Sequence, residues 1–160
     1  MSIQLEFAGE VPPGFGEVIF QKIIPSDLQV KASTLDELLG VMSRNSVFRD
    51  PDEEVRMRLC VDEVLVNAIV HGNEMSPDKR VTVTVYKSND RVGIRIEDEG
   101  PGFDPQDVPD PDDPESLLLE GGRGVLIITS FMDDVKYYCH GSRVLLVRKL
   151  GDESAPASGA

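Results

Sequence analysis

One stretch of this sequence, RVTVTVYKSNDRVGIRIED at residues 80–98, places the tightest constraint on the fold. Its apolar residues stand at every second position on both sides of a polar centre. Because side chains alternate between the two faces of a strand, this pattern gathers the apolar set on one face. The centre, Ser88-Asn89-Asp90, has the composition of a turn. We therefore predict a β-hairpin with one buried face, around which the rest of the chain is arranged.

The segment before this hairpin is predicted to be a helix with well-marked ends. Asp50 fits the N-cap, Pro51 fits the first helical position, and Glu53 completes a capping-box pattern. The helix is expected to run to His71, whose place in the last turn suits the helix dipole. Gly72 is then a natural C-terminal stop.

The remaining predicted elements are two further helices and three strands. The first two are a strand at 17–24, closed by Pro25, and a helix from about Leu28 to Ser43. An apolar helix, VLIITSFM, follows GGRG at 121–124. The last two are the strands VKYYC and RVLLVRKL, joined by a turn at 140–142. Strands that cluster in hairpins favour a mixed, mostly antiparallel sheet covered on one face by helices. The predicted fold class is therefore α+β, in the form of a two-layer α/β sandwich.

Residues 1–150 are expected to form a single domain, as is usual for a chain of 160 residues. From Glu99 to Glu120 the sequence has no periodicity and is rich in Pro, Asp and Gly. A loop of this length within a compact domain is typical of an active-site lid or of a disordered segment. We place a lid at about 99–120 and a disordered tail at 151–160.

Charge and hydropathy exclude several classes of function. The formal net charge of −13 disfavours direct nucleic-acid binding and an anionic membrane surface, since both partners attract Lys and Arg. No apolar stretch approaches the roughly 20 residues of a membrane-spanning helix, and the N-terminus lacks the pattern of a signal peptide. Cys60 and Cys139 are interpreted as reduced, buried thiols. We expect a cytoplasmic protein without membrane contact.

Glu63 and Asn67 lie one turn apart on the otherwise apolar helix, so they share a face, and His71 continues the same stripe. A carboxylate and an amide are costly to bury without hydrogen-bond partners. Either both side chains face solvent or pair with the backbone, or they line a binding pocket. The spacing alone leaves both interpretations open.

Two glycine-rich motifs follow at the ends of predicted elements. Asp98, at the end of a strand, precedes EGPG, and its carboxylate could accept a hydrogen bond from an exocyclic amine such as that of adenine. GGRG at 121–124 opens a helix, where free N–H groups and the positive helix end suit a phosphate. Arg123 could add a charge-assisted contact. Without a ligand, the same motifs would be a turn after a strand and a hinge before a helix.

The order of these motifs is more specific than any one of them. A helix with E-x-x-x-N is followed by a strand that ends in D-x-G-x-G, a long loop, and G-x-G at a helix start. This order resembles the Bergerat ATP-binding fold of the GHKL superfamily, which includes type II topoisomerases, MutL and sensor histidine kinases. Within it, DEVLVNAIVHG is similar to the motif of the serine/threonine kinases that act as anti-sigma factors in bacterial partner switching. The resemblance covers about residues 17–150.

The resemblance implies a role for each matching residue. Glu63 would be the catalytic general base that orients or deprotonates a substrate hydroxyl. Asn67 would supply an oxygen to Mg²⁺ on the ATP phosphates, and Asp98 would read the adenine amine. The glycine boxes would complete the cofactor site, with Gly100 and Gly102 at the pocket floor and Gly122, Arg123 and Gly124 around the phosphates.

The leading functional hypothesis is therefore an ATP-dependent serine/threonine protein kinase that acts as an anti-sigma factor. It would phosphorylate a STAS-type anti-anti-sigma protein and would bind a sigma factor or another regulator, and the resemblance implies a homodimer. One alternative is a nucleotide-responsive protein-binding regulator without useful catalysis. Another is a detached histidine-kinase catalytic domain that acts on a His of another protein.

The predicted lid has an unusual charge for a loop beside a triphosphate. From Asp104 to Glu120 its charged residues are all acidic, and acidic groups repel phosphates unless they point outward or Mg²⁺ intervenes. We favour a solvated loop that folds over the nucleotide only partly. The alternative is that the lid docks a basic surface of a partner.

Overall fold

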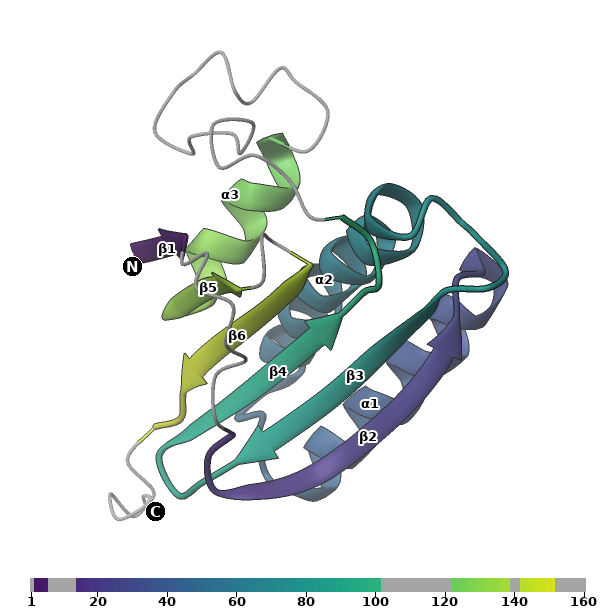
Figure 1. Cartoon of the computed structure of the whole chain (residues 1–160). Coiled ribbons are helices and arrows are strands. Elements are labelled where there is room, and N and C mark those ends of the chain that lie inside the picture. The colour runs from purple at the N-terminus through teal and green to yellow at the C-terminus, as the bar shows by residue number, and fades with distance from the viewer. Residues whose placement is uncertain (1, 6–13, 102–121, 139–141, 152–160) are drawn as a thin grey trace.

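The computed structural model of the chain describes residues 2–5, 14–101, 122–138 and 142–151. Within these ranges one sheet of six strands packs against three α-helices (Figure 1). The strands are β1 (Ser2–Leu5), β2 (Glu17–Pro25), β3 (Arg80–Lys87), β4 (Arg91–Glu97), β5 (Asp134–Tyr138) and β6 (Arg143–Lys149). The helices are α1 (Lys31–Arg44), α2 (Pro51–Val66) and α3 (Gly122–Phe131), with a short 3-10 helix η1 (Leu28–Val30) before α1 and a π-helical turn η2 (Asn67–Gly72) after α2.

The strand order across the sheet is β1-β5-β6-β4-β3-β2. Neighbouring strands are antiparallel except β1 and β5, which are parallel. The hairpin predicted at residues 80–98 is β3 and β4, with Val83 opposite Ile96 and Val85 opposite Ile94. The predicted mixed, mostly antiparallel sheet is therefore confirmed. The strand β1 is an addition that the sequence pattern does not predict.

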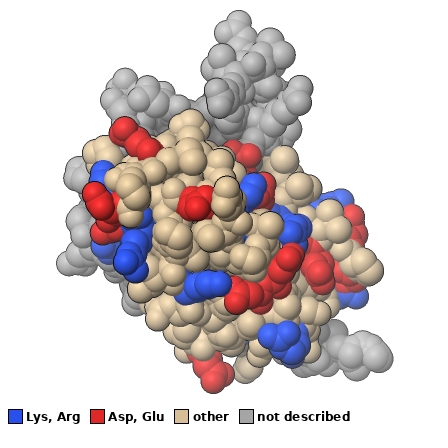
Figure 2. All heavy atoms as spheres, turned by 90° about the vertical axis from the view of Figure 1, so that its right-hand side faces the viewer, with Lys and Arg blue, Asp and Glu red and all other residues tan. Residues whose placement is uncertain are grey.

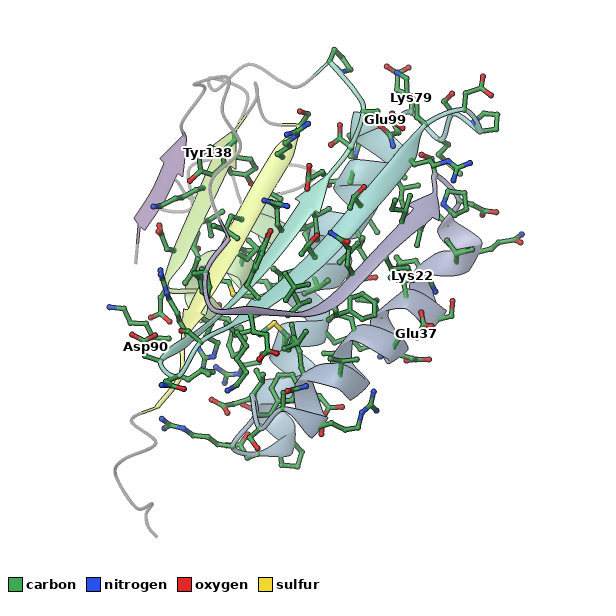
Figure 3. All side chains as sticks on the ribbon, turned by 60° about the horizontal axis from the view of Figure 1, so that its bottom comes forward. Lys22, Glu37, Lys79, Asp90, Glu99 and Tyr138 are labelled. Atoms are coloured by element: carbon green, nitrogen blue, oxygen red, sulfur yellow. The ribbon has the colours of Figure 1, made fainter. Side chains whose placement is uncertain are left out.

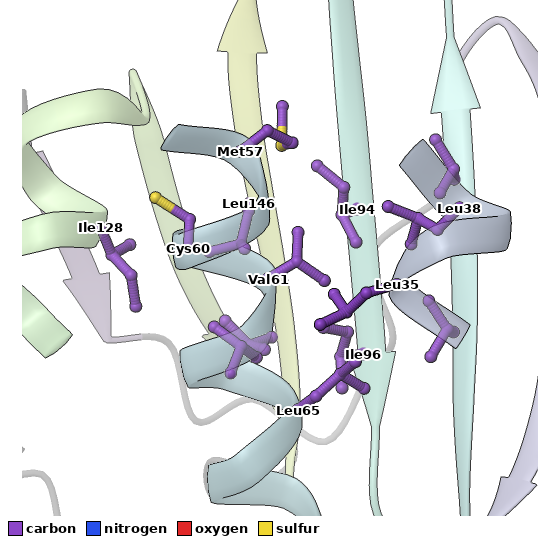
Figure 4. Close-up of a cluster of buried hydrophobic side chains, with 14 of the residues drawn as sticks. Leu35, Leu38, Met57, Cys60, Val61, Leu65, Ile94, Ile96, Ile128 and Leu146 are labelled. Atoms are coloured by element: carbon purple, nitrogen blue, oxygen red, sulfur yellow. The ribbon is translucent and has the colours of Figure 1, made fainter. Parts of the chain in front are cut away.

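A hydrophobic core lies between the helices and one face of the sheet (Figure 4). The alternating apolar residues of the hairpin supply its sheet side, and α1 and α2 supply the helix side. Leu38, Leu65 and Ile94, one from each of these elements, are all 0 % exposed. Burial of one such side chain contributes about 1.5–3 kcal/mol. The predicted two-layer sandwich is confirmed, and this core fixes α2 over the centre of the sheet.

The second face of the sheet is partly covered as well. Thr84 and Tyr86 alternate with the core valines of β3, yet they are only 1 % and 6 % exposed. Phe15 packs on this face over Gly93, where a Cβ would come within 2.7 Å of the Phe15 ring. Leu145 belongs to the same small cluster. The predicted hairpin with one buried face is thus correct for the core face and incomplete for the other.

The start of α2 follows the predicted cap with one difference. The Asp50 carboxylate accepts from the N–H of Glu53 at 2.9 Å, and Pro51 is the first residue of the helix. The Glu53 carboxylate accepts from the N–H of Arg49 at 2.6 Å, where the capping-box pattern requires the N–H of Asp50. Its other oxygen accepts from the Arg148 guanidinium at 2.9 Å. The reciprocal half of the capping box is therefore shifted by one residue to the N–H of Arg49, and the same carboxylate also links α2 to β6.

The outer surface of α1, α2 and β2 carries charges of both signs (Figure 2). An ion pair of Lys22 with Glu37 joins β2 to α1, and one of Arg58 with Asp36 joins α2 to α1 at 2.9 Å. Exposed pairs of this kind contribute only about 0–1 kcal/mol each, so the core and not the ion pairs orients these elements. Among the described residues of this face, the mixture leaves no continuous basic surface.

Candidate active site

The helix that carries Glu63 changes character inside the predicted motif. α2 ends at Val66, and residues 67–72 form the π-helical turn η2, in which the N–H of Asn73 bonds to the Ala68 carbonyl at 2.8 Å. The prediction of a continuous α-helix to His71 is therefore wrong in its last turn and a half. The wider turn is held by Asn73, whose side chain is anchored outside the helix. Short π-helical turns of this kind recur at functional sites.

Glu63 and Asn67 nevertheless keep the relation that their spacing predicts. The N–H of Asn67 bonds to the carbonyl of Glu63, so the two side chains remain one helical turn apart. Glu63 is half-buried, whereas Asn67 and His71 are exposed. The carboxylate and the amide are thus accessible to a ligand and are not packed into a dry core.

Tyr137 of β5 is a neighbour of Glu63 that the sequence analysis does not predict. Burial raises the pKa of the Tyr137 phenol above its ordinary value, and the negative charge of Glu63 raises it further. The side chain packs at the margin of the main core. Because α2 and β5 are far apart in sequence, no local pattern reveals this pair.

Asp98 follows β4 directly and is held on both sides. Its N–H bonds to the carbonyl of Ser142 at 2.8 Å, and its Oδ1 accepts from the N–H of Gly100 at 2.8 Å. Burial raises the pKa of its carboxyl from 3.8 to about 6, although the Gly100 hydrogen bond and the positive charge of Lys79 oppose the rise. A partly buried carboxyl with a shifted pKa, placed by the backbone around it, is a good candidate for a functional group.

Gly72 and Gly100 bring two stretches of backbone into contact around this carboxyl. A Cβ at Gly72 would lie 2.5 Å from Cγ of Asp98, and a Cβ at Gly100 would lie 1.9 Å from the carbonyl oxygen of Gly72. Distances this short leave no space for any side chain. A Cβ at Gly100 would therefore clash with backbone, and a Cβ at Gly72 would displace the Asp98 carboxyl, so the end of η2 and the Asp98 turn form one continuous site.

Asn73 is a second residue of this site that the sequence analysis misses. Its side chain is 0 % exposed and hydrogen-bonds to Ser26, Arg80 and Glu99, which lie in three separate segments. An Asn after a helix-ending Gly is ordinary turn chemistry, so its type and position alone carry no distinct signal. Only the burial and the hydrogen bonds of the Asn73 side chain identify this residue as part of the site.

The second glycine box begins α3. Gly122 is the first residue of the helix and Gly124 lies in its first turn. The N-terminal end of α3, the turn η2 and the end of β4 all lie at the same end of the molecule (Figure 1). α3 packs beside α2, where the Cys60 thiol donates to the Ile127 carbonyl at 3.7 Å. The fold thus brings the three predicted motifs to one end of the sheet.

Some predicted features lie outside the described residues. Gly102, most of the predicted lid, Cys139 and the tail from residue 152 are among them, and the side chain of Arg123 is not described. Cys60 is described, and it is a free, buried thiol as predicted. Burial raises the pKa of Cys60 to about 12, so the thiol is protonated and unreactive at neutral pH.

A hollow of about 410 Å³ lies elsewhere, between α1 and the start of α2. Its lining combines apolar residues with charges of both signs, among them Phe48, Arg49, Asp50 and Arg58. It includes none of the candidate site residues. Within the described ranges, no three His, Cys, Asp or Glu residues gather into a metal site, and no helix is long and apolar enough to span a bilayer.

Comparison with known proteins gives a consistent result. Residues 25–148 match the family described as histidine kinase-like ATPase domain. The serine-protein kinase RsbW of Listeria monocytogenes serovar 1/2a is 29% identical over 126 residues, which cover 72% of this chain and 77% of the relative. The anti-sigma F factor of Anoxybacillus flavithermus is 31% identical over 111 residues, covering 65% of this chain and 75% of the relative. The serine-protein kinase RsbW of Oceanobacillus iheyensis is 26% identical over 123 residues, with 72% and 77% covered.

Proposed function

The chain belongs to the histidine kinase-like ATPase family, and from this premise we propose that it is an ATP-dependent serine/threonine protein kinase that acts as an anti-sigma factor. It would phosphorylate a STAS-type anti-anti-sigma protein, and in alternation it would bind a sigma factor or another regulator. The kinase part of this proposal follows the serine-protein kinase relatives, and the anti-sigma part follows the anti-sigma F factor relative.

One observation carries the nucleotide part of the proposal: the Asp98 carboxyl sits between Gly72 and Gly100, where no Cβ fits. The N–H of Gly100 fixes one carboxyl oxygen, and the other oxygen can accept a hydrogen bond from the exocyclic amine of adenine. The two glycines let the flat base approach the backbone closely. This arrangement of donor, acceptor and space suits adenine.

The N-terminal end of α3 supports the phosphate part of the proposal. Gly122 begins the helix, and the free N–H groups and positive end of a helix attract phosphate oxygens. Gly124 lies within the same first turn. By the resemblance of the motifs, Arg123 would approach the phosphates and Gly102 would shape the pocket floor.

Asn67 is proposed to hold Mg²⁺ through its amide oxygen, which suits an ion that prefers oxygen ligands. The described residues contain no cluster of His, Cys, Asp or Glu that could bind the ion alone. Oxygens of the ATP phosphates would therefore supply further ligands beside Asn67. Bound Mg²⁺ neutralises the charge of the transferring phosphoryl group.

Glu63 is proposed as the general base. It is half-buried and one turn from Asn67, so a substrate hydroxyl aligned with the phosphates would meet its carboxylate. The carboxylate takes the proton of the Ser or Thr hydroxyl while the hydroxyl oxygen bonds to the γ-phosphorus. The bond from that phosphorus to the bridging oxygen breaks at the same time, and ADP leaves.

A homodimer and a cytoplasmic location complete the proposal. A protein that regulates a sigma factor has to work where transcription takes place. Self-association is compatible with the exposure of Val18 and Ile23 on the edge strand β2, which are 52% and 59% exposed. Exposed apolar side chains on an edge strand are common where chains associate.

The test is a transfer assay with labelled Mg-ATP and a protein extract of the host cells. Wild type, Glu63→Gln and Glu54→Gln are compared, because Glu54 is an exposed glutamate on the same helix and serves as a matched control. We expect wild type and Glu54→Gln to label a small protein with an acid-stable phosphate. Glu63→Gln should bind ATP and transfer no label.

Other outcomes point to the alternative functions. ATP binding without any labelled acceptor would favour a nucleotide-responsive regulator without useful catalysis. An acid-labile phosphate on the acceptor would favour a detached histidine-kinase domain. Failure of wild type to bind ATP would contradict the nucleotide site itself.

A further inference from the structure

The fully buried side-chain amide of Asn73 lies at the end of the sheet that carries Asp98. Asn73 is 0 % exposed, and its Nδ2 donates to Oγ of Ser26 at 2.9 Å and to the carbonyl of Arg80 at 3.0 Å. Its Oδ1 accepts from the N–H of Glu99 at 2.7 Å. Both N–H donors and the acceptor of this side chain are therefore satisfied, which is what a buried amide requires.

The partners of Asn73 lie on separate elements of the fold. Ser26 follows β2, Arg80 begins β3, and Glu99 is the second residue after β4. The backbone N–H of Asn73 in turn bonds to the Ala68 carbonyl of η2 at 2.8 Å. Asn73 therefore joins the helical segment that carries Glu63 and Asn67 to the peptide that follows Asp98.

Two further contacts give this network a single orientation. The Ser26 hydroxyl donates to the carbonyl of Lys79 at 2.7 Å, so its oxygen remains as an acceptor for Asn73. The Glu99 carboxylate accepts from the N–H of Arg80. Glu99 is thus held through its backbone and through its side chain, next to Lys79 (Figure 3).

The position of Glu99 decides the orientation of Asp98. The Asp98 carboxyl is fixed by the N–H of Gly100, and Gly100 is the next residue after Glu99. The Glu99 N–H that Asn73 holds belongs to the peptide between Asp98 and Glu99, and the Gly100 N–H belongs to the next peptide. Release of the first peptide would therefore let the second one change direction, and the carboxyl would lose its fixed orientation. Asn73 prevents this rotation without contributing an atom to the surface that faces a ligand, since it is completely buried.

We propose that Asn73, supported by Ser26, is a positioning residue that aims the Asp98 carboxylate at the base of the nucleotide and so sets the preference for adenine over guanine. The inference rests on the proposed ATP site. Adenine presents an amine donor where guanine presents a carbonyl acceptor, so a fixed carboxylate attracts the first and repels the second. A carboxylate that can rotate away loses much of this discrimination.

The test compares Asn73→Ala and Ser26→Ala with Thr34→Val and wild type. Thr34 is also 0 % exposed, but its hydroxyl bonds to the carbonyl of Val30 at 2.8 Å at the start of the neighbouring helix α1. Thr34→Val removes a buried hydrogen bond that involves neither Asn73 nor Asp98. It therefore reports the effect of lost stability alone.

The readouts are the Kd values of ATP and GTP by calorimetry, and kcat and KM for phosphoryl transfer. Asn73→Ala should weaken ATP binding by roughly ten-fold, the scale of one buried hydrogen bond, and should lower the ratio of ATP to GTP affinity. KM should rise while kcat at saturating ATP changes little. Ser26→Ala should move the same values in the same direction by less, and Thr34→Val should leave them unchanged.

A folded Asn73→Ala with the affinity and the ATP preference of wild type would overturn the inference while the proposed function stands. Absence of ATP binding by wild type would overturn both. Hydrogen exchange on nucleotide-free wild type gives a test that needs no variant. The Glu99 amide should be strongly protected because it bonds to buried Asn73, and rapid exchange at Glu99 would also overturn the inference.

Discussion

At the scale of single residues, the Asp98 carboxyl is predicted to make ATP affinity depend on pH. Burial raises its pKa to about 6, so in the free protein it takes up a proton as the pH falls through this value. A protonated carboxyl is a poorer acceptor for the adenine amine, so ATP affinity should fall between neutral pH and about pH 5. Calorimetric titrations across this range measure the effect. ATP phosphates titrate nearby, so Asp98→Asn is the control, and an identical pH profile in that variant would contradict the prediction.

The same pKa shift has a consequence for folding. An acid whose pKa is raised in the folded protein, here from 3.8 to about 6, keeps its proton in the folded state over a range where the unfolded chain has released it. The free energy of unfolding therefore falls as pH rises through this window and levels off above it. Asp98→Asn resembles the protonated form and escapes this loss.

We therefore expect nucleotide-free Asp98→Asn to gain stability relative to wild type as pH increases from about 4 to about 7. Urea denaturation at several pH values measures the difference. The comparison uses the wild type and the variant in the same buffers, so titration of all other groups cancels. A difference that stays constant with pH would show that the carboxyl has an ordinary pKa in the folded protein.

At the scale of the elements, sequence patterns predict what local interactions determine. The β3–β4 hairpin follows from alternation, and the start of α2 follows from the Asp50 cap, because both depend on residues close in sequence. The strand β1 is four residues long and pairs with β5, more than 100 residues away, so no local signal marks it. The turn η2 depends on the contacts of Asn73, which form only in the folded chain.

The residues of the candidate site likewise divide into those that the sequence predicts and those that only the fold reveals. Glu63, Asn67, Asp98 and Gly100 belong to motifs whose spacing is visible in the sequence, and the structure brings the helix and the Asp98 turn together. Asn73 serves the site through hydrogen bonds to distant segments, so its role is invisible before the fold is known.

Two glycines, one in α1 and one in the turn after β4, should respond in opposite ways to alanine. A Cβ at Gly40 of α1 would meet only the flexible Arg44 side chain at 3.3 Å, whereas a Cβ at Gly100 would lie 1.9 Å from a carbonyl oxygen of Gly72. Gly40→Ala should raise the free energy of unfolding by about 0.5–1 kcal/mol, because alanine favours the helix. Gly100→Ala should lower both stability and ATP affinity, because the backbone around Asp98 has to move.

Urea denaturation and calorimetric ATP titration measure the two effects, and each variant is the control for the other. ATP affinity should be unaffected by Gly40→Ala, since α1 contributes no residue to the site. Retention of wild-type ATP affinity in Gly100→Ala would contradict the close contact of the two backbones.

At the scale of the whole molecule, Arg148 of β6 joins three elements on the side of the fold away from Asp98. Its guanidinium donates to the carbonyl of Phe131, the last residue of α3, at 2.7 Å and to the Glu53 carboxylate of α2 at 2.9 Å. It also lies over the Phe131 ring at 3.8 Å. A cation at the C-terminal end of a helix is favourable, and Arg148 thereby fixes the end of α3 opposite to the proposed phosphate contacts.

We expect Arg148→Lys to lower the free energy of unfolding by about 1–2 kcal/mol, because a lysine cannot make both hydrogen bonds and stack on the ring. The matched control is Arg56→Lys, since Arg56 forms an exposed pair with Asp52 in which both side chains are more than half exposed. That variant should change stability by less than about 0.5 kcal/mol. Urea denaturation of both variants measures the values, and equal losses would show that Arg148 acts as an ordinary surface charge. Because α3 also carries Gly122 at its other end, Arg148→Lys should weaken ATP binding while Arg56→Lys leaves it unchanged.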